Sequence, residues 1–497
     1  MHNSEDNSKK NGFFLLVLSI SLATFMSSLD GTIVNIALPT ISESFDVSTS
    51  SVSWVATIYL LVMAGCLLIF GKLSDSVGFK KIFLSGFIVF TAGSFACGFI
   101  PDFFSSFDSL IGSRALQAVG GAMITAIAPA MIAAYVPFNM KGKAMGIVMT
   151  VASLGMALGP TLGGILTQYL SWHWVFFINV PVGIFAVALG TKVIPNENGS
   201  KNNDGFDKKG AFLIFAGLAL LLFGISEGQA MGWTNPAIVV SVILALILLA
   251  LFVFNELKDK NPLLELSLFK SKNFILMNSI VALIFFSFAG INYLMPFYLE
   301  YVLGYDTSSA GFILTSLSFS MMIAGILAGL LFNKTGGKKL TILAAFLIAG
   351  GYFMMTRLHA DTGLSFVIVC LILIGFGLGL LVTPLFNMIM NSTAKNYQGM
   401  VSSLTSLERF APMTIGIAVY NLVLIQGVLA ISSHHGITTT APVNIKLEIL
   451  SAGFDFAFFI AFIVGMIVFI LSFFVKEEVH PDYLEKADDD SAIMASL

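Results

Sequence analysis

The sequence GKLSDSVGFKK, residues 71–81, separates two long apolar runs, and the similar sequence GLLFNKTGGKK, residues 329–339, separates two others. Counted from the first glycine of each, a polar residue lies at +4, a glycine at +7 and lysines at +9 and +10. Two unrelated turns could each carry a lysine pair, but a shared register favours duplication of a larger unit. The chain is therefore expected to contain two similar halves.

The amino-acid composition places these halves in a membrane. Of the 497 residues, 57% are hydrophobic and 11% are charged, whereas an average soluble domain has roughly 25% charged residues. Too few charged side chains are present to cover the surface of a soluble protein of this size. The formal charge of −3 gives no basic field of the kind that attracts nucleic acid. We therefore expect a lipid bilayer, and no nucleic acid, as a partner.

The sequence contains fourteen apolar runs of about the 20 residues that a membrane-spanning helix needs. None alternates with the period of a membrane β-barrel, so every span is predicted to be a helix. The shortest run is closed early by Glu227. The first run is too long for the core of a signal peptide, so we expect it to be retained. The runs are 12–38, 52–71, 82–100, 108–135, 144–166, 173–193, 211–226, 237–254, 274–299, 309–332, 340–358, 364–390, 400–430 and 453–475.

Lysine and arginine are divided unequally between the two sides of these spans. With residues 1–11 in the cytoplasm, 21 of the 25 basic residues fall in cytoplasmic segments and 2, Arg357 and Lys446, in outer ones. The other two, Arg114 and Arg409, lie inside predicted helices. The positive-inside rule therefore predicts a multi-pass protein of the cell membrane with both termini in the cytoplasm.

Aligning the two copies of the lysine-rich turn makes predicted helices 1–6 equivalent to helices 9–14 and leaves helices 7 and 8 over. Two similar six-helix bundles around a central site are typical of alternating-access transporters, and we expect a functional monomer. The sequence thus predicts an all-α integral membrane protein. Its expected parts are a tail at 1–11, a bundle at 12–193, an inserted helix pair at 211–254, a second bundle at 273–475 and a tail at 476–497.

Cofactor and metal chemistry are not indicated. Cys66, Cys97 and Cys370 lie far apart within apolar runs, which argues against a disulfide framework or a metal cluster. The sequence has no phosphate-binding loop of the form GxxxxGK[ST], which disfavours an ATP-driven pump. Without a catalytic constellation or an appended soluble domain, an enzyme or a sensory scaffold is not expected, and an ion gradient remains as the energy source.

Asp30 and Arg114 are ionisable residues within predicted spans, where such a group costs about 3 kcal/mol even on a lenient insertion scale. Counted from the outer ends of their helices, near residues 38 and 108, both lie about 9–12 Å deep. They could form a proton relay in which Asp30 carries the proton and the charge of Arg114 tunes it. The alternatives are a permanent structural pair and an aspartate that caps a helix break.

A row of glycines marks the predicted fifth helix. Gly146, Gly155, Gly159 and Gly163 are spaced 9, 4 and 4 residues apart, so they lie near one face, where a neighbouring backbone can approach closely. Pro160 removes a backbone donor and bends the helix. We expect a tight seam between the two halves with a pliable point, and the alternative is a passive packing contact.

Candidate substrate-binding residues lie mostly on the predicted ninth and tenth helices. Aromatic faces attract organic cations, and methionines adapt to varied ligands, although among 47 phenylalanines an aromatic cluster could also be packing. On helix 13, Glu408 could be a second proton site or meet a cationic substrate. It points about 100° away from the adjacent Arg409, and the two could instead be satisfied separately. The candidates are Asn35, Phe286, Asn292, Tyr293, Met322 and Glu408.

Five motifs, in order along the chain, resemble those of the major facilitator superfamily, and specifically of its fourteen-helix drug–proton antiporter branch. They are the first-helix sequence LDGTIVNIALP at 29–39, the loop at 71–81, and the fourth-helix sequence RALQAVGG at 114–121, in which Ala118 replaces the usual glycine. The others are the fifth-helix glycines, with Gly159-Pro160 and Gly163-Gly164, and the sixth-helix sequence WHWVFFINVP at 172–181.

The resemblance implies the major facilitator fold, a coupling role for Arg114, and export by antiport for a protein with this fifth-helix motif. It also implies that Asp75 locks the two halves in the outward-facing state, within a turn that includes Gly71, Gly78, Lys80 and Lys81. Gly78 would supply the positive φ that a tight turn needs.

Residues and resemblance together predict a proton-coupled multidrug efflux pump, an antiporter that exports small amphipathic or cationic compounds by rocking of two bundles. Its partners would be a small-molecule substrate and protons. The alternative is a proton-coupled transporter of one physiological solute, such as an amino acid, a siderophore or a peptide.

Overall fold

The computed structural model describes residues 2–136, 138–195, 207–259, 262–394, 398–434 and 443–481. Within these ranges every regular element is a helix, as the apolar runs without a β-barrel alternation predicted. The elements are α1 (His2–Phe45), α2 (Thr49–Val77), α3 (Phe79–Phe104), α4 (Phe107–Tyr135), α5 (Phe138–Tyr169), α6 (Trp174–Phe177), α7 (Asn179–Val193), α8 (Lys208–Met231), α9 (Pro236–Glu256), η1 (Leu266–Lys270), α10 (Lys272–Phe297), η2 (Tyr298–Val302), α11 (Thr307–Thr335), α12 (Gly337–Met355), α13 (Leu364–Asn391), α14 (Gln398–His434) and α15 (Val443–Ser472).

Fourteen helical segments of the described chain are long and apolar enough to cross a membrane, which confirms the predicted number. The sixth, Trp174–Val193, is built from the short α6 and from α7. The predicted end of the first helix near residue 38 was wrong, because α1 continues through Pro39 to Phe45. Proline removes a single backbone donor, which a long membrane helix with close neighbours tolerates.

The duplicated turn has the same backbone conformation in both copies. α2 and α3 meet at Gly78, whose φ is 97°, and α11 and α12 meet at Gly336, whose φ is 81°. Residues with a Cβ rarely adopt such positive φ values. Glycine therefore allows a single residue to join two helices at each of these places.

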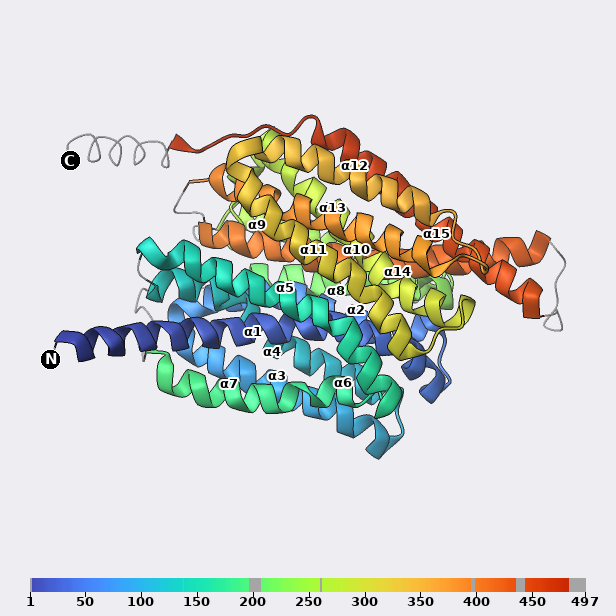
Figure 1. The fold of residues 1–497 in the computed structure, drawn as a ribbon, viewed down its shortest axis with the longest axis horizontal. Helices are drawn as coiled ribbons and strands as arrows, with labels where there is room; N and C mark the ends of the chain where they lie inside the picture. Colours follow the sequence, from blue (N-terminus) through green and yellow to red (C-terminus); the bar gives the residue numbers. More distant parts are fainter. Residues whose placement is uncertain are drawn as a thin grey trace.

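Apart from α8 and α9, the long helices pack as two bundles, α1–α7 and α10–α15, and the contacts within one bundle match those within the other (Figure 1). In the first bundle α1 packs against α5, α2 against α4, and α3 against α4 and α7. In the second, α10 packs against α14, α11 against α13, and α12 against α13 and α15. The bundles meet through α5 with α11 and through α2 with α14. Exchanging each helix for its counterpart in the repeat converts one set of contacts into the other, so the two bundles are pseudo-symmetric, as predicted.

The inserted helices α8 and α9 pack against each other outside this repeat. α8 also contacts α2 and α14, so it bridges the two bundles along one of their seams. The indole Nε1 of Trp54 on α2 donates a hydrogen bond of 2.6 Å to Glu227 Oε1 on α8. The apolar span of α8 ends at Ile225, close to the predicted end, and the helix itself continues through Glu227 to Met231.

α1 begins, and the described chain ends, on the same side of the molecule, at the left of Figure 1. We call this side the terminal face and the other side the opposite face. Successive spans run in alternate directions, so α4 and α13 end at the terminal face and α5 and α14 begin there.

Candidate functional site

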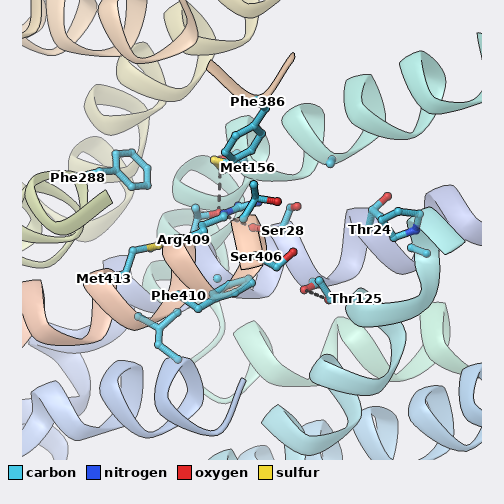
Figure 2. Close-up of a pocket in the computed structure, with 18 of the residues that line it drawn as sticks. Thr24, Ser28, Thr125, Met156, Phe288, Phe386, Ser406, Arg409, Phe410 and Met413 are labelled. Carbon is cyan, nitrogen blue, oxygen red and sulfur yellow. Dashed lines mark hydrogen bonds between the residues drawn. The ribbon is translucent and has the colours of Figure 1, made fainter. Parts of the chain in front are cut away.

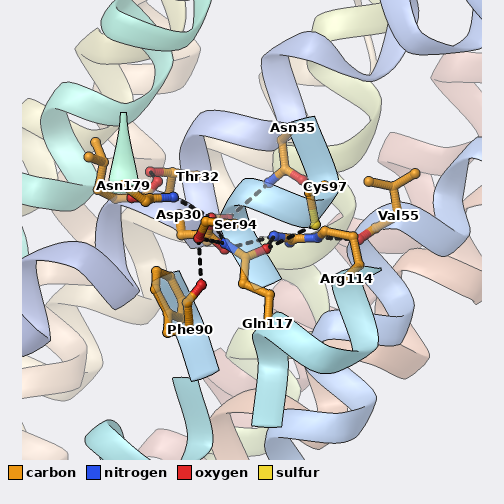
Figure 3. A network of polar contacts seen from close by, with 12 residues as sticks. Asp30, Thr32, Asn35, Val55, Phe90, Ser94, Cys97, Arg114, Gln117 and Asn179 are labelled. Atoms are coloured by element: carbon orange, nitrogen blue, oxygen red, sulfur yellow. Dashed lines mark hydrogen bonds and ion pairs between the residues drawn. The ribbon is translucent and has the colours of Figure 1, made fainter. Parts of the chain in front are cut away.

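Asp30, in the middle of α1, lies at the centre of a buried polar network (Figure 3). Its Oδ2 accepts a hydrogen bond of 2.8 Å from Arg114 Nη1. Its Oδ1 accepts bonds of 2.8 Å from Gln117 Nε2 and 3.0 Å from Asn179 Nδ2. The four residues come from α1, α4 and α7, and each is at most 1% exposed. The negative charge of Asp30 is therefore stabilised by one guanidinium and two amides instead of water.

Further contacts fix the orientation of these donors. Arg114 Nη1 also donates to Gln117 Oε1 at 2.6 Å, and its Nε donates to the backbone oxygen of Val55 at 3.1 Å. Gln117 Nε2 donates to Ser94 Oγ at 2.8 Å. The guanidinium carbon of Arg114 lies 4.2 Å from the ring centre of Tyr59, close enough for a cation–π contact. The network thus spans α1 to α4 and α7, and it holds Arg114 on several sides.

Uptake of a proton by Asp30 would change the balance of charge in this network. The neutral acid loses its ionic attraction to Arg114, and among the described residues Arg114 forms no ion pair with another acid. A buried guanidinium without a counter-charge is unfavourable. If Asp30 carried the proton, Arg114 would lose its counter-charge, and a rearrangement of Arg114 or of α4 relative to α1 would be favoured.

A void of about 10 Å³ lies beside this network and is lined in part by Asp30, Asn35 and Arg114. Its volume is close to the least that one water molecule needs. Asp30 is thus separated from a larger cavity by one layer of side chains. The residues that line both spaces are Gly31, Tyr59, Leu60, Asn292 and Met413.

The larger cavity, of about 450 Å³, lies between the two bundles (Figure 2). Its volume falls within the roughly 300–1,000 Å³ typical of small-molecule sites. Aromatic rings, hydroxyl groups and amides make up most of its functional groups. The lining residues are Thr24, Ser27, Ser28, Gly31, Thr32, Tyr59, Leu60, Thr125, Ala128, Pro129, Val148, Ala152, Met156, Phe288, Asn292, Phe386, Asn387, Met390, Thr405, Ser406, Arg409, Phe410 and Met413.

Arg409 is the one charged side chain among the described residues that line the larger cavity. Its Nε is buried without a hydrogen-bond partner, and its guanidinium carbon lies 5.7 Å and 5.4 Å from the ring centres of Phe285 and Phe410. The neighbouring Glu408 does not line the cavity, and its Oε2 is buried without a partner. None of the ion pairs among the described residues joins these two adjacent side chains.

The other predicted substrate-binding residues are divided between this region and the packing around it. Asn292 lines both spaces, and Asn35 lines the small void. Tyr293 instead donates a hydrogen bond to the backbone oxygen of Thr49 across the two bundles. The lining of the larger cavity does not include Phe286, Tyr293 or Met322.

Three glycines of the fifth-helix motif lie against α1, within the first bundle. A Cβ added at Gly155 would lie 2.7 Å from the backbone oxygen of Phe25, and one added at Gly159 would collide with Thr32. A Cβ at Gly163 would meet residues of α1 in the same way. These glycines therefore allow α5 to approach α1 closely, whereas the sequence had led us to expect a contact between the two halves. The surroundings of Gly146 lie outside the described part of the chain.

Pro160 and Gly164, from the same motif, lie against α11 in the second bundle. A Cβ added at Gly164 would lie 2.6 Å from the backbone oxygen of Thr307, and the backbone oxygen of Pro160 lies against Gly311. The hydroxyls of Thr161 and Thr315 share a hydrogen bond in the same seam. The glycines of the fifth-helix motif thus contact two neighbouring helices, α1 and α11, and Pro160 lies where the bundles meet.

The position of these contacts shows where the bundles are closed. The α5–α11 seam and the bond between Tyr293 and Thr49 lie toward the opposite face, because α11 and α2 begin there. The cavity is lined by 125–129 of α4, 386–390 of α13 and 405–413 of α14, all nearer the terminal ends of their helices. The cavity therefore lies toward the terminal face, and the bundles are packed together on the other side.

The duplicated turn lies at the terminal face. Gly71 lies within α2, and the side chain of Asp75 lies outside the described part of the structure. Lys80 Nζ donates a hydrogen bond of 2.9 Å to the backbone oxygen of Thr191 in the last turn of α7, where helix carbonyls favour a positive charge. Lys81 is exposed.

Sequence reasoning had not identified three members of this site. Gln117 and Asn179 contact Asp30 directly, and Tyr59 lies between Arg114 and the cavity. Gln117 and Asn179 are polar residues inside apolar runs, which is a signal of a membrane-buried partner. Tyr59 carried no such signal, because the sequence around it does not distinguish it from the other aromatic residues of the spans.

Comparison with known proteins places this geometry in a family. The family model described as Major Facilitator Superfamily matches residues 20–417. The chain is 34% identical to the riboflavin transporter RibZ of Clostridioides difficile (strain 630) over 82% of this chain and 87% of that protein. It is 32% identical to the multidrug transporter protein MdtP of Bacillus subtilis (strain 168), over 82% of this chain and 75% of that protein.

The solved structures include a similar fold. The crystal structure of a D-xylose-proton symporter superposes with a TM-score of 0.66, covering 94% of this chain and 98% of that one, at 14% sequence identity. At this identity the likeness concerns the fold alone. Together with the fourteen apolar helices, the paired bundles and the match over most of its length, these similarities show that the chain belongs to the Major Facilitator Superfamily of membrane transporters.

Proposed function

We propose that this protein is a proton-coupled exporter of small amphipathic compounds that works by alternating access. The observation that carries the proposal is the buried Asp30–Arg114 ion pair, which lies one layer of side chains from a cavity between two pseudo-symmetric bundles. An ionisable group buried in a membrane is by default a functional candidate, and this one adjoins the space that a substrate would occupy.

In this proposal the terminal face is cytoplasmic and the membrane is the cell membrane, in line with the excess of lysine and arginine on that side. The arrangement described above is then the inward-facing state, with its cavity toward the cytoplasm and its outer seam closed along α5 and α11. Rocking of the bundles about their interface would open that seam and close the cytoplasmic side. The protein would work as a monomer.

Coupling would follow from the charge balance around Asp30. A proton that reaches Asp30 from outside weakens its attraction to Arg114, and Arg114 in turn contacts Tyr59 in the cavity wall. The substrate, in the cavity, and the proton, on Asp30 behind the cavity wall, would thus both act on the part of the wall that includes Tyr59. Release of the proton to the cytoplasm would restore the ion pair and reset the cycle.

A second candidate function is proton-coupled transport of one physiological solute. It is favoured by the 34% identity to a protein named as a riboflavin transporter. Under this alternative the cavity would be selective for one compound, and riboflavin would be the first to test.

The test uses proteoliposomes that contain a pH-sensitive dye and carry an imposed proton gradient. Amphipathic dyes, quaternary ammonium compounds and riboflavin are added in turn to wild type, to Asp30→Asn and to Asp108→Asn, which changes an exposed carboxylate on α4. We expect substrate-evoked proton flux in wild type and Asp108→Asn and its loss in Asp30→Asn. Flux with a single compound would favour the second candidate, and full flux in Asp30→Asn would refute the coupling role.

A further inference from the structure

We infer that the larger cavity selects small amphipathic organic anions and that Arg409 binds their carboxylate. This inference rests on the proposed function and narrows its substrate class. It differs from the expectation from sequence, in which aromatic residues and Glu408 pointed to cationic compounds.

The charge of the cavity wall comes, in the described part of the chain, from a single side chain, that of Arg409. Among the described residues, Arg409 is the one charged group that lines the cavity, and the lining includes no carboxylate. Asp30 lines the small void beside it, but its charge is already balanced by Arg114 at 2.8 Å. Glu408 lies outside the lining. The wall therefore carries a net positive charge.

The surroundings of Arg409 leave this charge without a counter-ion. Its Nε has no hydrogen-bond partner, and none of the ion pairs among the described residues involves it. Contacts with the rings of Phe285 and Phe410, at 5.7 Å and 5.4 Å, offset part of the desolvation. A half-buried cation without a counter-ion inside a membrane span still remains unfavourable, and a carboxylate that enters the cavity would supply the missing partner.

The chemistry of guanidinium indicates which group fits. A guanidinium is planar and presents parallel N–H donors that match the two oxygens of a carboxylate. A cationic ligand would instead meet a like charge in the cavity wall. Arg409 therefore distinguishes ligands by the sign of their charge.

The other lining residues indicate what the uncharged part of the ligand is like. Phe288, Phe386 and Phe410 offer aromatic surface, and Ser27, Asn292 and Asn387 offer hydroxyl and amide groups. A volume of about 450 Å³ admits a compound of two or three rings. The ligand class is thus an aromatic body with an anionic group and a few hydrogen-bonding substituents.

The test compares three compounds that share one ring system: 2-naphthoate, the neutral 2-naphthamide and the cationic 2-naphthylmethylammonium. Binding to the purified full-length protein is measured by isothermal titration calorimetry without a proton gradient. We expect naphthoate to bind wild type most tightly and the ammonium compound least tightly. Failure of naphthoate to bind, or equal or tighter binding of the ammonium compound, would overturn the inference, and this comparison needs no variant.

Two variants test the role of Arg409 itself. Arg409→Gln should weaken naphthoate binding about 10- to 100-fold, the usual contribution of a charged hydrogen-bonded pair, and should leave naphthamide binding nearly unchanged. The matched control is Arg357→Gln, since Arg357 is exposed and also lies over a ring, that of Phe353, at 5.8 Å. Equal losses for naphthoate and naphthamide would assign Arg409 a packing role and refute recognition of charge.

The same compounds separate this inference from the proposed function. Tight naphthoate binding without proton flux in proteoliposomes would support the anion site and refute proton-coupled export. Proton flux evoked by the ammonium compound but not by naphthoate would support proton coupling and refute the anion site.

Discussion

Asp30→Asn should remove proton coupling and also destabilise the protein, because of what the substitution does to Arg114. Arg114 is 1% exposed and forms its ion pair with Asp30. Removing one partner of a buried pair typically costs about 3–5 kcal/mol, since the other charge stays buried. The new amide also brings N–H groups toward the donors of Gln117 and Asn179, which now share Asp30 Oδ1. The free energy of unfolding should therefore fall by at least about 3 kcal/mol.

The double variant Asp30→Asn/Arg114→Gln isolates the coupling role from the structural one. With the unpaired charge removed, most of the lost stability should return, so the two substitutions should be strongly non-additive. Proton coupling should not return, because no group remains at this place to carry a proton. Thermal unfolding of the purified protein and proton flux in proteoliposomes measure the two effects separately, with Asp108→Asn as the surface control.

Three outcomes would contradict these expectations for Asp30 and Arg114. Full pH-driven transport by Asp30→Asn would show that the relay lies elsewhere. Wild-type stability of Asp30→Asn would show that Arg114 does not depend on the charge of Asp30. Recovery of both stability and coupled transport in the double variant would show that the pair is structural only.

Two further substitutions test the contacts that organise the bundles. Gly164→Val should prevent closure of the seam between α5 and α11, because a Cβ at this position would lie 2.6 Å from the backbone oxygen of Thr307. Spin labels across α5 and α11 should then report a longer distance, whereas Gly112→Ala, where a Cβ would have open space, should leave it unchanged. Trp54→Phe should lower the stability of the protein by about 1.5–3 kcal/mol, because the 2.6 Å hydrogen bond to Glu227 is lost. An unchanged unfolding temperature would mean that this bond does not help to hold α8 on the first bundle.

Much of the fold was predictable because hydrophobicity and repetition act over whole helices. A span of about 20 apolar residues has few stable alternatives to a helix in a membrane. The register shared by residues 71–81 and 329–339 identified the repeat, and Gly78 and Gly336 then adopt the same kind of positive φ. The ends of the helices were less predictable. Pro39 and Glu227 resemble helix ends in the sequence, but both helices continue past these residues, to Phe45 and Met231.

The site was predictable only in part, because its members are joined through three-dimensional contacts. The estimate of equal depth for Asp30 and Arg114 anticipated that the two could meet, although α1 extends further beyond Asp30 than that estimate assumed. Gln117 and Asn179 were visible as polar residues in apolar spans, but nothing in the sequence directed them to Asp30. The same limit applies to the adjacent Glu408 and Arg409, because which of them faces the cavity depends on the rotation of α14.

The buried Arg114 and the half-buried Arg409 indicate how coupling and recognition could be kept apart in one membrane protein. Arg114 is surrounded by partners of its own chain, so its charge is balanced before any ligand arrives and changes only when Asp30 changes. Arg409 lies in the cavity wall without such a partner, so its balance depends on what enters the cavity. Tyr59 lies between these environments, since its ring contacts Arg114 and lines the cavity. A ligand that neutralises Arg409 and a proton that neutralises Asp30 would each alter the charge balance near this ring, which provides a physical route by which occupancy of one site could affect the other.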